Sequence, residues 1–493
     1  YNLFDKNNTK LIINNEKFKF EFKFFKRINK FIICKYKVFI PYDKVLNFEI
    51  HNKLEFVGEN KRGYGYKKSL YYNIYDKKAG KYKVSKLKII KENNTTLYIR
   101  QTAGNKICLT NRQINITDNI EEKRKINLAW LCSKIVIKKP IILYEKESSR
   151  YQESASVLYE KLIDEGYKNL YYILDKENFN NLNIQEKYKK NIIIKNTFKH
   201  YLYFFIAKTF LGTESPAHAI ELRIAVRKAV KRIYSNKFKY VFLQHGVMYM
   251  VSLDSSGRSF FRKEGIMPNN SKIVVSSKLE AQHFIDLGGY DKKDLYICGL
   301  PKFDKNKRNK IHKKIIVMPT WRPWEFNLVR ENPYESSYYK FLEQIIEQIS
   351  KELIKNVIIL PHPLFVDALK ETKMSKYMIK DVVYDEILRE TDTLITDYSS
   401  IAYDAFYRGS NVIFVWTDKD KCMEEYKGHL MLNDNNVFGD VCYNYTDVSE
   451  KLLKNYNNRQ NVKYLKRYKK IVEFHDNKNT ERLIKLMKKD KII

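Results

Sequence analysis

Residues 394–409 read LITDYSSIAYDAFYRG, an apolar run followed by a carboxylate, two serines and a helical pattern. The run predicts the end of a buried strand, and Ser399 and Ser400 stand where the N-cap of a helix over 401–409 belongs. A helix start presents unpaired N–H groups and the positive end of the helix dipole, so it attracts anions. Gly409 marks the C-terminal stop. The stretch therefore predicts a strand–turn–helix unit with an anion site at its turn; the alternative is that a serine only caps the helix.

Short apolar runs alternate with helical stretches on both sides of this unit, as in parallel strands that are buried on both faces. A first series contains PIILYE (140–145), NLYYILD (169–175), NIIIKN (191–196), KTFLGT (208–213), YVFLQHG (240–246), KIVVSS (272–277) and LYICGLP (295–301). A second series contains KIIVMPT (314–320), NVIILPHP (356–363), DTLITDYSS (392–400) and NVIFVWTD (411–418). The two series predict an α/β protein with two doubly wound, Rossmann-like domains that face each other across a cleft.

Residues 1–117 instead alternate aromatic or β-branched residues with charged ones, as in FKFEFKFFKR (18–27). This period of two predicts antiparallel strands with one solvated face. The polar, cationic stretch 302–314 separates the two apolar series and is typical of a linker. We therefore expect a small β-rich accessory module over 1–117, an acceptor-side Rossmann-like domain over 118–304 and a donor-binding one over 305–493.

The chain has 493 residues, 44% of them hydrophobic, which is enough for several cores. Its apolar runs, such as YLYFFIA (201–207), are far shorter than the roughly 20 residues that span a bilayer. It begins at Tyr1 and no charged-then-apolar leader follows, so we expect a piece of a longer protein, from which targeting is not judged. Six cysteines without a CxxC pair are typical of reduced thiols in a cytosolic protein, rather than of a disulfide framework or a zinc site.

The formal net charge of +35 indicates an anionic partner, for which nucleic acid, anionic lipid and a phosphorylated polymer all qualify. Part of this charge follows from a composition that is rich in Lys throughout. One segment, ELRIAVRKAVKRIYSNKFK (221–239), predicts a basic amphipathic helix. Such a helix either lies on anionic lipid or packs on the core by its apolar stripe, and the sequence leaves both open.

Ligands of open parallel sheets bind at the carboxyl ends of the strands, so the residues after each apolar run are candidates for a site. A single histidine or hydroxyl there is more simply explained as a cap or a satisfied core group, but four such strand ends point to a ligand. The candidates are His245 and Gly246, then Thr320 and Arg322, then His362, and finally Asp397, Ser399 and Ser400.

The chemistry of these candidates divides them between the two domains. The planar guanidinium of Arg322 suits a phosphate, and with His362 and the Ser399–Ser400 helix start it would form a pyrophosphate clamp. His245 comes from the other domain and would face this clamp, where an ordinary histidine pKa near 6.5 suits a general base. His218, in TESPAHAIELR, either belongs to the acceptor side or serves only capping and packing.

Some chemistries are excluded or weakly indicated. The chain has no GxxxxGKS loop, which argues against an ATPase or a kinase. The acidic DKD (418–420) is interpreted as a solvated loop rather than a metal site. No cofactor and no metal ligand are predicted, and a divalent metal is left open.

Six motifs resemble those of the CDP-glycerol glycerophosphotransferase family, which makes teichoic acids and related capsular polymers. They are QHG (244–246), GLPKFD (299–304), MPTWR (318–322), PHP (361–363), TDYSSIAYDAF (396–406) and HDNKNTERL (475–483), and their order and spacing agree over roughly residues 125–490. The chain departs from the family pattern at Gln244, where many members have Trp, at VMYM (247–250), and at Lys302, where Arg is usual.

The resemblance implies a GT-B architecture and a transferase. It would move a polyol phosphate, glycerol phosphate above all, from a CDP-activated polyol to a hydroxyl of a lipid-linked or polymeric acceptor and release CMP. It also implies a cytoplasmic enzyme, peripheral on the inner face of a bacterial cell membrane and bound to its anionic surface.

The resemblance further implies roles for individual residues. His245 resembles the catalytic base, with His362 as a second catalytic group. The donor phosphate and CDP contacts would be Thr320, Arg322, His362, Asp397, Ser399 and Ser400. The acceptor side would comprise Gln244, Gly246 and His218.

Two rival functions remain. A GT-B glycosyltransferase that uses a nucleotide sugar for surface polysaccharide would have the same two-domain cleft, and donor competition separates the two. A non-enzymatic basic protein that binds nucleic acid or lipid would show a steep salt dependence and no nucleotide turnover. We regard nucleic acid as the less suitable partner, because the hypothesis of a non-enzymatic binding protein gives the polar residues at the strand ends no function.

Overall fold

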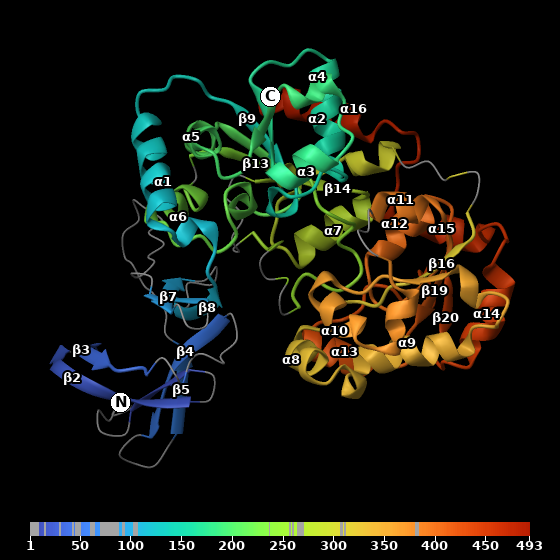
Figure 1. Cartoon of the computed structure of the whole chain (residues 1–493), viewed down its shortest axis with the longest axis horizontal. Coiled ribbons are helices and arrows are strands. Elements are labelled where there is room, and N and C mark those ends of the chain that lie inside the picture. The colour runs from blue at the N-terminus through green and yellow to red at the C-terminus, as the bar shows by residue number, and fades with distance from the viewer. Residues whose placement is uncertain are drawn as a thin grey trace.

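A computed structural model describes residues 9–13, 16–28, 31–41, 44, 51–59, 65–69, 88–90, 94–101, 107–235, 237–255, 258, 261–263, 271–305, 309, 312–379 and 384–493. It contains three sheets, one in the N-terminal region and two in the rest of the chain (Figure 1). We call these parts the β module, the first lobe and the second lobe. The fold is α/β with a small β-rich N-terminal region, as predicted.

The β module is an antiparallel sheet in the order β3-β2-β1-β4-β8-β7-β6, with β5 paired to β4. Its strands are β1 (Lys10–Ile13), β2 (Glu16–Ile28), β3 (Phe31–Val38), β4 (His51–Glu59), β5 (Gly65–Ser69), β6 (Lys88–Ile90), β7 (Thr95–Gln101) and β8 (Ile107–Gln113). A buried ion pair between Arg112 and Asp118 closes its end, and Tyr98 and Arg112 both donate to the carbonyl of Arg223. These bonds attach the module to the first lobe.

The first lobe is a parallel sheet in the order β11-β10-β9-β12-β13-β14-β15. Its strands are β9 (Ile141–Tyr144), β10 (Leu170–Leu174), β11 (Ile192–Ile194), β12 (Thr209–Gly212), β13 (Lys239–Phe242), β14 (Lys272–Val275) and β15 (Leu295–Ile297). Its helices are α1 (Ile120–Cys132), α2 (Ser154–Asp164), α3 (Lys176–Asn181), α4 (Glu186–Lys189), α5 (Phe198–Ile206), α6 (Arg227–Ile233) and α7 (Lys278–Asp286). Each predicted run of the first series forms a strand, and the strand order reverses between β9 and β12.

The second lobe is a parallel sheet in the order β17-β16-β18-β19-β20. Its strands are β16 (Lys314–Val317), β17 (Val357–Ile359), β18 (Thr391–Thr396), β19 (Asn411–Val415) and β20 (Asp440–Cys442). Helices α8 (Phe326–Glu331), α9 (Ser337–Gln348), α10 (Val366–Lys370), α11 (Tyr384–Arg389), α12 (Ile401–Tyr407), α13 (Lys419–Tyr426), α14 (Asp447–Asn455), α15 (Val462–Ile471) and α16 (Asn479–Lys489) follow in this part of the chain. The strand order reverses between β16 and β18, and only β20 was not predicted.

The last helix, α16, returns to the first lobe. Asp490 accepts a hydrogen bond from Tyr296 at 2.7 Å and pairs with Lys272 at 2.7 Å. At its other end, Asp304 accepts from the backbone N–H groups of Asn479 and Thr480. Pro301–Lys305 is therefore a packed turn rather than the beginning of a linker, and the domain boundaries at 117 and 304 stay predictions.

The basic segment 221–239 is not one amphipathic helix. Among its described residues only Arg227–Ile233 is helical, and Arg223 has a left-handed backbone with φ of 60°. The apolar stripe of α6, which includes Val230 and Ile233, is buried in the core. The stripe packs on the protein and is not available to lipid.

Among the described residues, no helix is long and apolar enough to cross a membrane. Cys108, Cys132, Cys298, Cys422 and Cys442 form no disulfide in the described part of the chain.

Candidate active site

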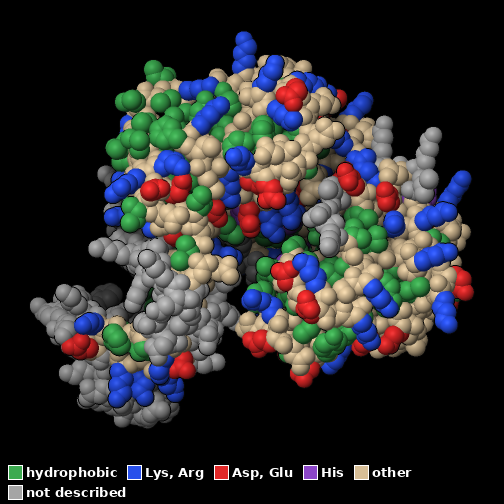
Figure 2. Space-filling model, in the orientation of Figure 1, with side chains coloured by type: hydrophobic (Ala, Val, Ile, Leu, Met, Phe, Trp, Pro, Cys, Tyr) green, Lys and Arg blue, Asp and Glu red, His purple; other side chains and the backbone are tan. Residues whose placement is uncertain are grey.

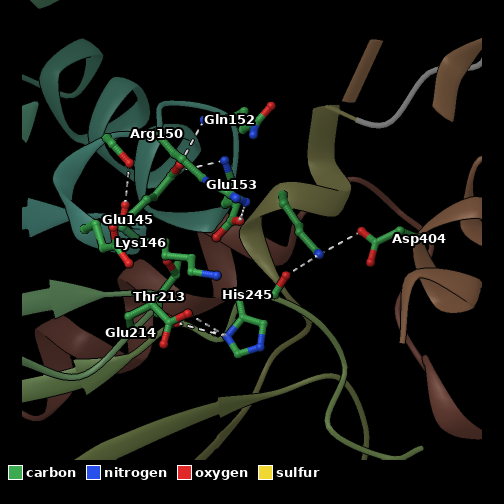
Figure 3. Close-up of polar contacts among 12 residues, drawn as sticks. Glu145, Lys146, Arg150, Gln152, Glu153, Thr213, Glu214, His245 and Asp404 are labelled. Carbon is green, nitrogen blue, oxygen red and sulfur yellow. Dashed lines mark hydrogen bonds and ion pairs between the residues drawn. The ribbon is translucent and has the colours of Figure 1, made fainter. Parts of the chain in front are cut away.

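The carboxyl ends of β9, β12 and β13 meet at the first lobe's topological switch point, which is the usual ligand position in such sheets. His245, after β13, points there toward the residues after β12 (Figure 3). Its Nδ1 lies 3.6 Å from Glu214 Oε1 and 3.4 Å from the carbonyl oxygen of Thr213. Both neighbours are acceptors, so Nδ1 carries the proton and Nε2 is left as an acceptor. The side chain is 39% exposed, so the ring is open to a substrate.

Glu214 is the carboxylate that supports this ring. Burial raises the pKa of the Glu214 carboxyl, while the positive charge of His245 in its protonated form and that of Lys146 oppose this rise. The hydroxyls of Tyr144 and Tyr240 both donate to the backbone carbonyl of Glu214 and fix its position. Sequence reasoning missed Glu214, although it directly follows the predicted strand over 208–213 and the strand-end rule would have found it.

The three predicted acceptor-side residues have different environments. Gln244 is fully buried with a left-handed φ of 57°, and its amide donates to the Val274 carbonyl in the core. A Cβ at Gly246 would lie 3.3 Å from Ser400 Oγ, so this glycine allows the two lobes to approach. His218 is buried 4.0 Å from Glu214, and burial with nearby cations lowers its pKa to about 3. Their roles toward an acceptor stay predictions.

In the second lobe, β16 and β18 end side by side at the other switch point. Asp397 Oδ1 accepts from the backbone N–H groups of Thr320 at 2.7 Å and of Tyr398 at 2.6 Å. Arg322 is only 2% exposed, and it pairs with Asp418 at 2.8 Å and with Asp397 at 3.5 Å. Although burial alone would lower it, the pKa of Arg322 is raised by these carboxylates.

The structure changes one prediction about these residues and leaves another untested. Asp418, which was interpreted as part of a solvated loop, is an ion-pair partner of Arg322 and accepts from Tyr398. Arg322 is buried and paired with two carboxylates, as a residue that stabilises the lobe would be. Its contact with a donor phosphate stays a prediction.

His362 follows β17 and stacks on Trp321, with ring centroids 5.0 Å apart and an interplanar angle of 15°. Its Nδ1 accepts from the backbone N–H of Leu364 at 3.3 Å. Burial, together with the charges of Lys146 and Arg150 from the first lobe, lowers its pKa to about 4. The ring is therefore neutral near pH 7, with its proton on Nε2.

Residues 394–409 form the predicted strand–turn–helix unit. Helix α12 begins at Ile401, and Gly409 follows it with a left-handed φ of 97°. Ser400 occupies the N-cap but makes no side-chain capping bond, while Ser399 Oγ accepts from the Ile401 N–H at 3.4 Å. The Ser400 hydroxyl is thus not used as a cap, and it faces Gly246 of the first lobe.

Helix α12 is bonded directly to the loop that carries His245. Lys302 Nζ donates to the backbone carbonyl of His245 at 2.8 Å and pairs with Asp404 of α12 at 2.7 Å (Figure 3). The Tyr403 hydroxyl donates to the Tyr249 carbonyl at 2.6 Å. These bonds bring His245 and the Ser399–Ser400 turn together across the cleft.

The sequence of residues 127–489 matches the family described as CDP-Glycerol:Poly(glycerophosphate) glycerophosphotransferase. The chain belongs to this family. Within it, Lys302 takes the position where the family resemblance expects Arg, and it still bridges the two lobes.

Two curated relatives act in teichoic acid synthesis by name. The minor teichoic acid biosynthesis protein GgaB of Bacillus subtilis (strain 168) is 23% identical over 371 residues, covering 70% of this chain and 39% of the relative. The teichoic acid poly(ribitol-phosphate) polymerase of Bacillus spizizenii is 27% identical over 179 residues, covering 31% of this chain and 27% of the relative. The chain thus spans well under half the length of these relatives.

Among solved structures, the wall teichoic acid polymerase TagF (H444N variant) superposes with a TM-score of 0.54 at 17% identity, covering 75% of this chain and 93% of that one. The same variant soaked with CDPG for 15 minutes gives a TM-score of 0.53 at 16% identity. These matches show that this family member shares the TagF fold.

No three His, Cys, Asp or Glu side chains gather as a metal site in the part of the chain that the structure describes.

Proposed function

We propose that this protein transfers a polyol phosphate, glycerol phosphate above all, from a CDP-activated polyol to an acceptor hydroxyl and releases CMP. One observation carries the proposal within the family. The carboxylate-supported His245 of the first lobe directly precedes Gly246, which faces the Ser400 hydroxyl at the start of α12 in the second lobe, and both segments follow strands.

The reaction needs one proton transfer and one displacement. His245 Nε2 takes the proton of the acceptor hydroxyl, whose oxygen attacks the β-phosphorus of the donor. A new phosphate ester bond forms, the bond between the β-phosphorus and the bridging oxygen breaks, and CMP leaves. Glu214 stabilises the imidazolium that forms, because its carboxylate lies 3.6 Å from Nδ1.

The second lobe would bind the donor phosphates. His362 Nε2–H, the hydroxyls of Ser399 and Ser400, and the N–H groups at the start of α12 are the available donors. Arg322 adds a fixed positive charge behind them, oriented by Asp397 and Asp418. Phosphoryl transfer depends mainly on this kind of positioning and charge stabilisation.

We also propose that the acceptor is lipid-linked or polymeric and that the enzyme works at the inner, anionic surface of a bacterial membrane. Exposed apolar residues gather on α1 and the segment after it, and Lys side chains surround them (Figure 2). This α1 surface comprises Ile120 (68% exposed), Leu128 (53%), Leu131 (56%), Ile135 (81%) and Ile137 (90%). Apolar side chains rimmed by Lys suit a surface of anionic lipid.

Donor competition tests the proposed reaction. CMP release is measured from CDP-glycerol and from CDP-ribitol, with and without a glycerol-phosphate-primed lipid acceptor. We expect acceptor-dependent release from one of them. Silence with both, but turnover of a UDP- or CMP-sugar, would identify a nucleotide-sugar glycosyltransferase instead.

Vesicle sedimentation tests the membrane surface. Ile135→Asp with Ile137→Asp should release the protein from phosphatidylglycerol vesicles, whereas Val462→Asp, at an exposed valine of α15, should not. Equal release by both would contradict the assignment to the α1 surface.

A further inference from the structure

The turn between β9 and α2 contains an unusual backbone. Glu147 and Ser148 are consecutive residues with φ of 55° and 54°. A side chain makes this left-handed conformation unfavourable, and residues that adopt it cluster at functional sites. The turn lies at the first lobe's switch point, beside Glu214 and His245.

Two sets of hydrogen bonds hold the turn in place. The buried carboxylate of Glu145 accepts from the backbone N–H groups of Gln152 (2.9 Å), Glu153 (2.9 Å) and Ser156 (3.0 Å). Its other flank is bonded to His218, because the Glu147 N–H donates to His218 Nδ1 at 3.1 Å and Ser148 Oγ donates to the His218 carbonyl at 2.8 Å. The turn is therefore a built feature and not a solvated loop.

The consequence of this construction is the placement of two cations. The Lys146 amine extends beside Glu214 and His245, and it makes no hydrogen bond or ion pair with any described residue (Figure 3). Arg150 has its Cζ 5.9 Å from the ring centroid of Tyr384 in the second lobe, and its Nη1 lies 3.6 Å from Glu153. Arg150 thus reaches a residue of the second lobe, while Lys146 lies beside the candidate base.

We propose that Lys146 and Arg150 form the subsite for the phosphate of the acceptor's terminal polyol-phosphate unit, an inference that rests on the proposed function. The cations belong to the base's lobe, while the candidate donor-phosphate groups belong to the other lobe. In a polyol-phosphate chain, a single polyol separates the reactive hydroxyl from the nearest phosphate. A phosphate bound at Lys146 therefore sets that hydroxyl beside His245.

Binding measurements can test this subsite without turnover. The full chain is saturated with CDP to fill the nucleotide site and then titrated calorimetrically with glycerol 3-phosphate, glycerophosphoglycerol and inorganic phosphate. We expect the two glycerol phosphates to bind, and Lys146→Met to weaken them about 10-fold or more, since hydrogen bonds to charged groups are strong. The affinity for CDP should stay within about two-fold, and Lys146→Arg should retain most probe binding.

A matched control is Lys466→Met, which removes the same charge from the exposed face of α15. It should leave binding of every probe unchanged. In turnover, Lys146→Met should raise the KM for a glycerol-phosphate-primed acceptor and leave the KM for CDP-glycerol unchanged.

Three results would overturn the subsite. Loss of CDP affinity in Lys146→Met, with probe binding unchanged, would assign the cations to the donor. If inorganic phosphate binds as tightly as the two glycerol phosphates, the site binds the free ion rather than a polyol phosphate. No probe binding to the CDP-saturated wild type would mean that no subsite exists, whereas failure of CDP itself to bind would contradict the proposed function.

Discussion

His245 and His362 follow strands in opposite lobes, yet their environments select opposite tautomers. His245 Nδ1 faces the oxygens of Thr213 and Glu214, so Nε2 is free to accept a proton. His362 Nδ1 accepts a backbone N–H from Leu364, so Nε2 carries the proton. One ring is prepared as a base, and the other is prepared as a neutral hydrogen-bond donor. The same residue type, placed after a parallel strand in each lobe, thus suits two different chemical tasks.

Removal of the proposed base should have the largest effect. His245→Ala should lower kcat by about 10²–10⁴, the usual contribution of general acid–base catalysis, with little change in the KM for the CDP donor. CMP release under saturating donor and acceptor measures this. The unfolding midpoint should not move, because the ring is partly exposed. Near wild-type turnover would mean that His245 is not the base.

The candidate cations of the two lobes also differ, because Lys146 of the first lobe has no ion-pair partner among the described residues, whereas Arg322 of the second lobe has two. Arg322 is buried between Asp397 and Asp418, so Arg322→Met should lower the free energy of unfolding by about 3–5 kcal/mol, the cost of leaving buried charges unpaired. Urea unfolding measures this loss, and Lys466→Met provides the exposed control. Full stability with a raised KM for CDP-glycerol would instead make Arg322 a direct phosphate ligand.

Lys302 links the two lobes, because it bonds to the His245 carbonyl of the first and to Asp404 of the second. Lys302→Met removes the bonds to the His245 carbonyl and to Asp404, and we expect kcat to fall about 10-fold, in line with hydrogen bonds to charged groups. Lys302→Arg should restore most of it, because the guanidinium can serve both acceptors. In a double-mutant cycle, Asp404→Asn should add little to Lys302→Met. Additive losses would show that the two residues do not act as one contact.

The strands were predictable because parallel strands buried on both faces are continuous apolar runs, as at Ile141–Tyr144 and Ile192–Ile194. The exception, Asp440–Cys442, is three residues long and begins with Asp, so it carries no such signal. Asp397 was found because it directly follows β18, and His245 because it comes shortly after β13.

Other features depend on partners that are distant in the sequence. The burial of Arg322 requires Asp397 and Asp418 from two further strand ends, and no local pattern shows that they converge. Lys146 and Arg150 lie in EKESSR, which is typical of a solvated loop, and only the position of β9 at the switch point places them in the cleft.

The smallest expected effect concerns the pH dependence of His362→Gln. The pKa of His362 is lowered to about 4, so the ring is already neutral throughout pH 5.5–8. The acid limb of the pH–kcat profile should therefore keep its midpoint in His362→Gln, while the KM for CDP-glycerol rises a few-fold. A shift of that midpoint would show that His362 is the titrating group and would break the assignment of tautomers.

The same lowered pKa has a consequence for stability, with a definite sign. The unfolded chain binds a proton at this histidine near pH 6.5, but the folded chain binds it only near pH 4. Between these values the unfolded state holds more protons, so this ring's contribution to stability is complete above pH 6.5 and is lost as the pH falls toward 4. The difference in thermal unfolding midpoint between wild type and His362→Gln should therefore be constant above pH 6.5. Between pH 6.5 and 4 the wild type should lose stability more steeply than the variant. Parallel curves between pH 4 and 6.5 would show that the pKa of His362 is not lowered in the folded protein. His362 would then not be fixed as a neutral donor.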